Sequence, residues 1–142
     1  MIDLSQVGAH LDGDYVRFGI YLPDLGKEES ICLTAKVSHV SDFAWKEIID
    51  CPLQYEDSRD GYPFYEGKLD LSGGKKGLYR YQYEIGKGDI VYPRWASDPF
   101  ARRTAAGHRS AFLYGDEEKV SVPSFDIPPV TELIVYECSV SE

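Results

Sequence analysis

A strict alternation of apolar and polar residues is the strongest pattern along this chain. In residues 14–22, Val16, Phe18 and Ile20 alternate with Arg17 and Gly19. Successive side chains of a β-strand point to opposite faces, so a period of two predicts a strand with one buried face.

The same alternation recurs in residues 31–40 and 78–85. Its apolar positions there are Ile31, Leu33, Ala35, Val37, Tyr79, Tyr81, Tyr83 and Ile85. Further strands are expected at residues 53–56, 62–71, 90–92 and 110–114, because valine, isoleucine and aromatic residues suit a pleated, half-buried surface. Several short strands at near-regular spacing predict an all-β fold, an immunoglobulin-like antiparallel β-sandwich, with the three tyrosines in its core.

Glycine and proline mark the connections between these strands. Turns are expected at residues 23–26 and 60–61. The glycine-rich run of residues 73–77 lies between two predicted strands and therefore predicts a hairpin loop.

The last part of the chain has a different character. An acidic stretch at residues 116–118 precedes a proline-rich stretch at residues 122–129 and an apolar run at residues 133–136. Such an apolar run is typical of a strand that is buried on both faces in a parallel sheet. We therefore expect one domain over residues 1–115, followed by an extended C-terminal segment, residues 116–142, whose strand belongs to another unit.

Composition and charge narrow the classes of partner. The chain has 142 residues and a net charge of −9, so it repels phosphate backbones, and no nucleic-acid partner is expected. A neutral ligand remains open. No apolar run reaches the ~20 residues of a membrane span, and the N-terminus lacks the features of a signal peptide, so we expect a cytoplasmic protein with no membrane partner. Cys32, Cys51 and Cys138 are too widely spaced to predict a disulfide framework or a zinc site.

Motifs for catalysis and metal binding are missing from the sequence. It contains no GxSxG, HExxH, GxGxxG or Walker motif. His10, His39 and His108 are isolated from one another, and the acidic residues 56–60 lack the spacing of a calcium loop. No catalytic residue, metal or cofactor is expected.

The two tryptophans are the candidate binding residues. Trp45 follows the predicted strand at residues 31–40, and Trp95 lies in a proline-framed turn after residues 90–92. Loops at strand ends can present a flat ring that covers the C–H face of a sugar, while nearby polar groups bond its hydroxyls. The alternative is that both rings cap the ends of the sandwich.

Four short segments, in order over about residues 8–115, resemble a known family. They are residues 16–23 (Val-Arg-Phe-Gly-Ile-Tyr-Leu-Pro), residues 41–45 (Ser-Asp-Phe-Ala-Trp), residues 77–83 (Gly-Leu-Tyr-Arg-Tyr-Gln-Tyr) and residues 97–102 (Ser-Asp-Pro-Phe-Ala-Arg). The chain is similar to the N-terminal early-set domain of α-amylase-superfamily enzymes, also called carbohydrate-binding module family 48. The second and fourth segments are similar to its "GDFNxW" and "DPYAR" motifs.

This resemblance implies a non-catalytic accessory domain of an isoamylase, branching enzyme or trehalohydrolase that acts on α-glucans such as glycogen or starch. It implies that Trp45 and Trp95 stack on α-1,4-glucan chains. Gln82 falls where glycogen-binding relatives carry a lysine, Ser110 falls near their asparagine, and Ala106 falls near their leucine. Gln82 and Ser110 can hydrogen-bond sugar hydroxyls.

Residues 129–137 also resemble the strand that opens the catalytic barrel of these enzymes. The barrel of the same parent chain is thus a second expected partner. The alternative function is a purely structural domain that packs against that barrel and binds no sugar.

Overall fold

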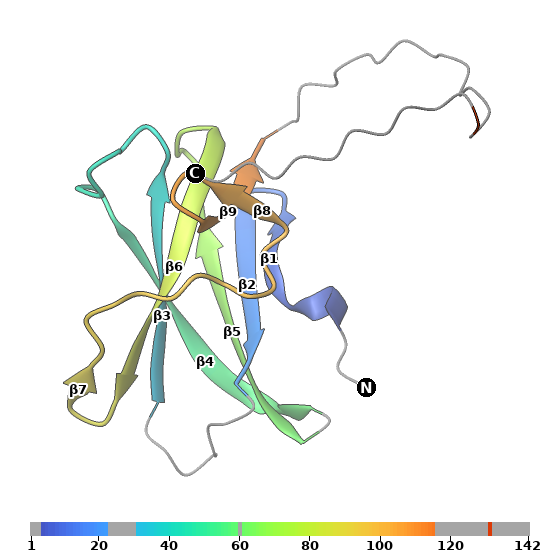
Figure 1. Ribbon diagram of the computed structural model, residues 1–142, viewed down its shortest axis with the longest axis vertical. Coiled ribbons are helices and arrows are strands. Elements are labelled where there is room, and N and C mark those ends of the chain that lie inside the picture. Colours follow the sequence, from blue (N-terminus) through green and yellow to red (C-terminus); the bar gives the residue numbers. More distant parts are fainter. Residues whose placement is uncertain (1–3, 23–30, 60, 116–130, 132–142) are drawn as a thin grey trace.

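The computed structural model describes residues 4–22, 31–59, 61–115 and residue 131. Within these residues the chain is all-β and antiparallel, with one short 3₁₀ helix, η1 (Leu4–Gln6), and no α-helix (Figure 1). The strands are β1 (Gly8–Asp12), β2 (Tyr15–Tyr21), β3 (Ile31–His39), β4 (Ile49–Arg59), β5 (Tyr62–Asp70), β6 (Gly77–Lys87), β7 (Ile90–Val91), β8 (Arg103–Ala105) and β9 (Arg109–Tyr114). The expectations for the turn at residues 23–26, for Cys138 and for the extended segment 116–142 concern parts outside this description, apart from Thr131.

The strands form one curled sheet in the order β1-β2-β5-β4-β3-β6-β9-β8, and β7 pairs with β6. β4 makes the bend, because its first part, Ile49–Leu53, pairs with β3 and its second part, from Gln54, pairs with β5. The register shifts between Tyr55 and Asp57, and a bulge of this kind bends and twists a strand. The predicted all-β antiparallel class is confirmed, although a half-barrel of this shape fits an immunoglobulin-like sandwich only loosely.

The alternating segments predicted from the sequence are strands. Residues 14–22, 31–40, 62–71 and 78–85 correspond to β2, β3, β5 and β6. β1 and the first half of β4 were not expected, since β1 is short and Pro52 interrupts the pattern of β4. Proline is tolerated at this position because this part of β4 pairs with β3 alone.

The predicted hairpin at residues 73–77 is wrong. β5 pairs with β2 and β4, whereas β6 pairs with β3 and β9. The glycine-rich segment does turn, and the N–H of Gly74 donates to the carbonyl of Leu71 over 2.8 Å. The glycine residues thus correctly predicted a turn. The two strands that flank the turn are not paired with each other, because each pairs with strands that are distant in sequence.

The core is aromatic and lies inside the curl. Phe18 is fully buried, and its ring centroid lies 4.9 Å from Tyr81 and 5.8 Å from Phe112. Tyr79 stacks on Phe112 with ring planes 3° apart. The alternation correctly predicted the buried positions Val16, Phe18, Ile20, Leu33, Ala35, Val37, Tyr79, Tyr81 and Tyr83.

A long connection from β7 to β8 runs across the strands (Figure 1). Ala96 and Tyr83 exchange two backbone hydrogen bonds of 2.7 and 2.9 Å. Further along, a Cβ on Gly8 of β1 would lie 2.8 Å from the carbonyl oxygen of Phe100, and the φ of Gly8 is +87°. A glycine is therefore required where this connection passes β1.

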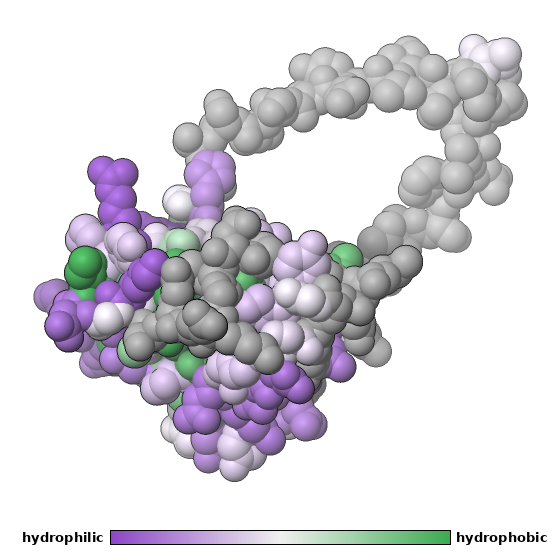
Figure 2. Space-filling model, turned by 90° about the horizontal axis from the view of Figure 1, so that it is seen from below, coloured by the Kyte–Doolittle hydropathy of each residue, from purple (hydrophilic) through white to green (hydrophobic). Residues whose placement is uncertain are grey.

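Hydrophilic residues dominate the described surface at the end of the molecule seen in Figure 2, with apolar residues in small separate patches. No helix among the described residues is long and apolar enough to cross a membrane.

Replacing Phe18 by alanine should lower the free energy of unfolding by about 3–5 kcal/mol, because a large ring is lost from a packed interior. The matched control is Phe43→Ala, since Phe43 is 86% exposed; its effect should stay within about 0.5 kcal/mol. Urea unfolding followed by circular dichroism measures both. Equal effects would contradict the assignment of the core.

Candidate carbohydrate-binding groove

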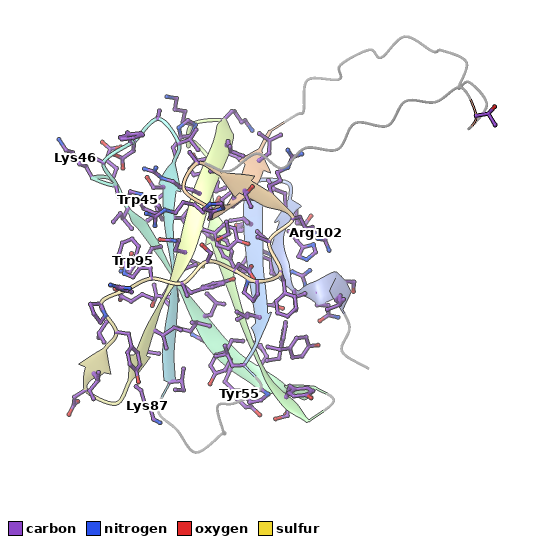
Figure 3. All side chains as sticks on the ribbon, viewed as in Figure 1. Trp45, Lys46, Tyr55, Lys87, Trp95 and Arg102 are labelled. Carbon is purple, nitrogen blue, oxygen red and sulfur yellow. The ribbon has the colours of Figure 1, made fainter. Side chains whose placement is uncertain are left out.

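Trp45 and Trp95 lie next to each other on the outside of the sheet. Trp45 belongs to the loop between β3 and β4, and Trp95 to the connection that follows β7 (Figure 3). Both side chains are half-buried, their ring centroids are 5.6 Å apart, and their planes meet at 70°. Together the two indoles form an apolar corner.

The loop around Trp45 is held by Asp42. Its carboxylate accepts the backbone N–H groups of Lys46 and Glu47 over 3.0 and 2.7 Å, and the Ser38 hydroxyl over 3.0 Å. These backbone N–H groups, that of Glu47 foremost, lower the pKa of Asp42. Trp45 itself has a φ of +54°, a conformation that costs a non-glycine residue on the order of 1–3 kcal/mol. The loop therefore holds Trp45 in a strained backbone conformation.

Two guanidinium groups fix the ring of Trp45. Arg80 on β6 lies 4.3 Å from the ring centroid, and Arg109 on β9 lies 5.6 Å from it. Arg80 also donates to the carbonyl of Asp42, and Arg109 donates to the side-chain oxygen of Gln82. Cation–π attraction of this kind orients an indole before any ligand arrives.

Trp95 is fixed through its ring nitrogen. Its Nε1–H donates to the carboxylate of Glu84 over 3.0 Å. The ammonium of Lys36 lies 5.8 Å from the ring centroid, 3.7 Å from Glu84 and 3.0 Å from Asp50. The ring is thus held against β6 by a hydrogen bond.

Asp98, three residues after Trp95, ties this connection to the core. Its carboxylate is buried and accepts the hydroxyls of Tyr81 over 2.7 Å and Tyr83 over 3.4 Å, as well as the backbone N–H of Phe100 over 2.8 Å. Burial raises the pKa of Asp98, and the hydrogen bonds it accepts oppose that rise. The inner face of β6 therefore anchors the segment that carries Trp95.

An open groove of about 460 Å³ lies at the tryptophan pair. Its lining residues are Trp45, Gln82, Pro93, Arg94, Trp95 and Arg109. The lining offers two aromatic planes, one amide and two guanidinium groups, a mixture of apolar wall and a few polar groups that suits ligand binding. Acids, thiols and hydroxyls do not line it, and no cluster of metal ligands occurs in the described part of the chain.

The structure brings together three of the four residues that the sequence nominated. Trp45, Trp95 and Gln82 line the groove, although the Gln82 amide already bonds Ser97 and Arg109.

Ser110 lies elsewhere. It is 1% exposed, and its hydroxyl donates to the carbonyl of Tyr81 and accepts the backbone N–H of Asp98. Ala106 is exposed and is not part of the lining.

Sequence reasoning missed Arg94 and Arg109. Arg109 precedes Ser110 on β9, and neighbouring residues of a strand face opposite sides. Strand alternation could therefore have nominated Arg109 for the groove in place of Ser110. Two of the histidines have structural partners: His10 contacts the carbonyl of Val7, and His39 contacts Ser41 and the carbonyl of Lys76.

No protein-family model matches this chain, and a search of curated proteins found no significant match.

Replacing Asp42 by alanine should free the Trp45 loop, because the substitution removes the acceptor for two backbone N–H groups. The near-ultraviolet circular dichroism that arises from the packed tryptophan pair should fall by more than half. Asp70→Ala is the control, since Asp70 also accepts a backbone N–H, that of Ser72, and does not line the groove. An unchanged spectrum in Asp42→Ala would show that the loop is held by other contacts.

Tyr81→Phe should lower the free energy of unfolding by about 1–3 kcal/mol, because buried Asp98 loses its shortest hydroxyl donor. Tyr83→Phe is the matched control and should cost less, since its contact with Asp98 is 3.4 Å long.

The pH dependence gives a second readout of the same pair. Folding raises the pKa of Asp98, so its contribution to stability is greatest below the unfolded pKa and declines as the pH rises through the folded pKa. Urea titrations at several pH values should show a steeper decline in Tyr81→Phe, where the pKa rises further. Parallel curves for both variants and the natural protein would refute this role of Asp98.

Proposed function

We propose that the described part of the chain is an immunoglobulin-like early-set domain that binds α-1,4-glucan chains and catalyses no reaction itself. The observation that carries this proposal is the pair of indole rings, 5.6 Å apart and 70° to each other, in an open groove with polar side chains at its wall. The order of the four sequence segments supports the same family and an accessory role in an enzyme that acts on glycogen or starch.

The groove suits the surface chemistry of a glucan. A pyranose ring presents C–H groups on its faces and hydroxyls at its edge. One face of the sugar can lie on an indole, while Gln82, Arg94 and Arg109, which also line the groove, can bond the sugar hydroxyls. Because the tryptophans are held in place before binding, little ordering of the protein opposes association.

Binding of this kind is weak. A lost stacking ring costs about 1–3 kcal/mol by analogy with base stacking on aromatic side chains. An open groove with two rings therefore corresponds to a Kd of about 0.1–1 mM. Such an affinity suits a domain that holds a polymer chain near a catalytic unit.

A second candidate function is supported by a separate surface. Ile90, Val91 and Tyr92 are 63%, 59% and 47% exposed and form a strip that leads into the groove-lining residues Pro93, Arg94 and Trp95. Three consecutive exposed apolar residues favour contact with another protein surface. In this alternative the strip packs against a catalytic barrel of the same parent chain, and the domain binds no sugar.

Titration with maltoheptaose separates the two functions. Glucan binding predicts amide shifts at the groove with a Kd of about 0.1–1 mM, and Trp45→Ala or Trp95→Ala should weaken it by about 5- to 150-fold. The control is Tyr92→Ala, which removes an aromatic ring from the apolar strip and should leave the affinity unchanged. No response from the natural protein at about 10 mM ligand would remove the glucan proposal and leave the packing function.

A further inference from the structure

We propose that the groove between Trp45 and Trp95 prefers an α-glucan that carries phosphate ester groups over the unmodified neutral chain. The inference rests on the proposed glucan-binding function and adds the chemical class of the ligand. Its starting point is the charge of the groove lining: Arg94 and Arg109 belong to it, and no acidic residue does.

This local charge is opposite to that of the whole chain. The sequence has 24 acidic and 15 basic residues and a net charge of −9. Two cations and no anion line this groove, and the hollow at Arg102 and Arg103 has a similar lining charge but includes no tryptophan. Attraction of a nucleic acid would need a broad basic surface, whereas these hollows present two arginines each.

Three acidic side chains beside the tryptophan pair are already engaged in other contacts. The carboxylate of Glu84 accepts the Trp95 Nε1–H and lies 3.7 Å from the ammonium of Lys36. Asp50 lies 3.0 Å from the same ammonium. The carboxylate of Asp42 is taken up by backbone N–H groups and Ser38. These acids form contacts beside the groove and do not pair with its two lining arginines.

The arginines retain unused donors. Arg94 is exposed and makes no hydrogen bond or ion pair with any described residue. Arg109 donates one N–H to the side-chain oxygen of Gln82, and a guanidinium group has further N–H donors. A planar guanidinium matches phosphate oxygens with two parallel hydrogen bonds, which makes arginine a favoured phosphate ligand.

Arg80 adds a third positive charge behind Trp45. It is 8% exposed, its guanidinium donates to the carbonyl of Asp42, and its Nε–H has no hydrogen-bond partner among the described residues. Burial lowers the pKa of Arg80, the nearby charge of Asp42 partly opposes that effect, and the charge of Arg109 adds to it. An anion bound at the groove would offset this crowding of cations, whereas a neutral sugar would not.

A neutral glucan requires none of this excess charge. Stacking on two indoles and a few hydroxyl contacts, which amides supply equally well, would hold it. The arginines therefore distinguish a phosphorylated glucan chain from a neutral one, because the phosphate ester is the group that bonds a guanidinium.

The test compares maltoheptaose with a singly phosphorylated maltoheptaose by calorimetric titration. At about 20 mM salt the phosphorylated chain should bind about fivefold more tightly or better, and at about 0.5 M salt the two affinities should converge, because screening weakens the charge contribution and leaves stacking intact. Arg94→Gln should remove at least half of the low-salt preference, measured as the ratio of the two affinities within that variant. Arg102→Gln is the matched control, because Arg102 is also exposed but lines a different hollow, between β1 and β9 (Figure 3).

The possible failures are distinguishable. Equal low-salt affinities for the two chains would overturn the phosphate preference and leave the glucan function standing. Equal losses in Arg94→Gln and Arg102→Gln would overturn the assignment to Arg94. Inorganic phosphate that binds as tightly as the phosphorylated chain would reduce the site to a simple anion site. Absence of binding by either chain would overturn both proposals.

Discussion

The buried carboxylate of Asp98 joins the core of this domain to its candidate site. Tyr81 and Tyr83 are core residues, yet their hydroxyls donate to the carboxylate of Asp98, which belongs to the long connection after β7. A buried carboxylate is stable only when donors surround it, so the connection is fixed where those hydroxyls are. Trp95, three residues earlier in the chain, is placed by this constraint together with the backbone pairing of Ala96 and Tyr83.

β6 serves two purposes through its two faces. Its inner residues Tyr79, Tyr81 and Tyr83 fill the curl of the sheet. On its outer face, Arg80 lies against Trp45, Gln82 lines the groove, and Glu84 bonds Trp95. One strand thus couples the packing of the core to the position of both indoles. A change in the register of β6 would therefore shift both tryptophans at the same time.

The candidate site is already ordered without a ligand. The strained backbone of Trp45, the hydrogen bonds of Asp42 and the cation–π contacts of two guanidinium groups all restrict Trp45. Strain of this kind persists only where surrounding contacts over-determine the conformation, and it is found preferentially at binding sites. Rigid aromatic surfaces limit the entropy that is lost on association, which matters most where the contact area is small.

The sequence by itself determined the all-β class, the strands β2, β3, β5 and β6, and the buried positions along them, because these follow from a period of two that each segment carries locally. It also singled out Trp45 and Trp95, since residue type and place relative to a strand are visible in one dimension, whereas Gln82 and Ser110 were nominated by the family resemblance. It could not show that β5 and β6 are separated by other strands, because long-range contacts choose strand partners. Tertiary structure decided which face of β9 is buried, so that Ser110 turns inward while Arg109 lines the groove. It also decided that Asp98 accepts the hydroxyls of Tyr81 and Tyr83, and that two arginines lie beside the tryptophan pair. Each of these depends on residues that lie far apart in sequence and meet only when the sheet curls.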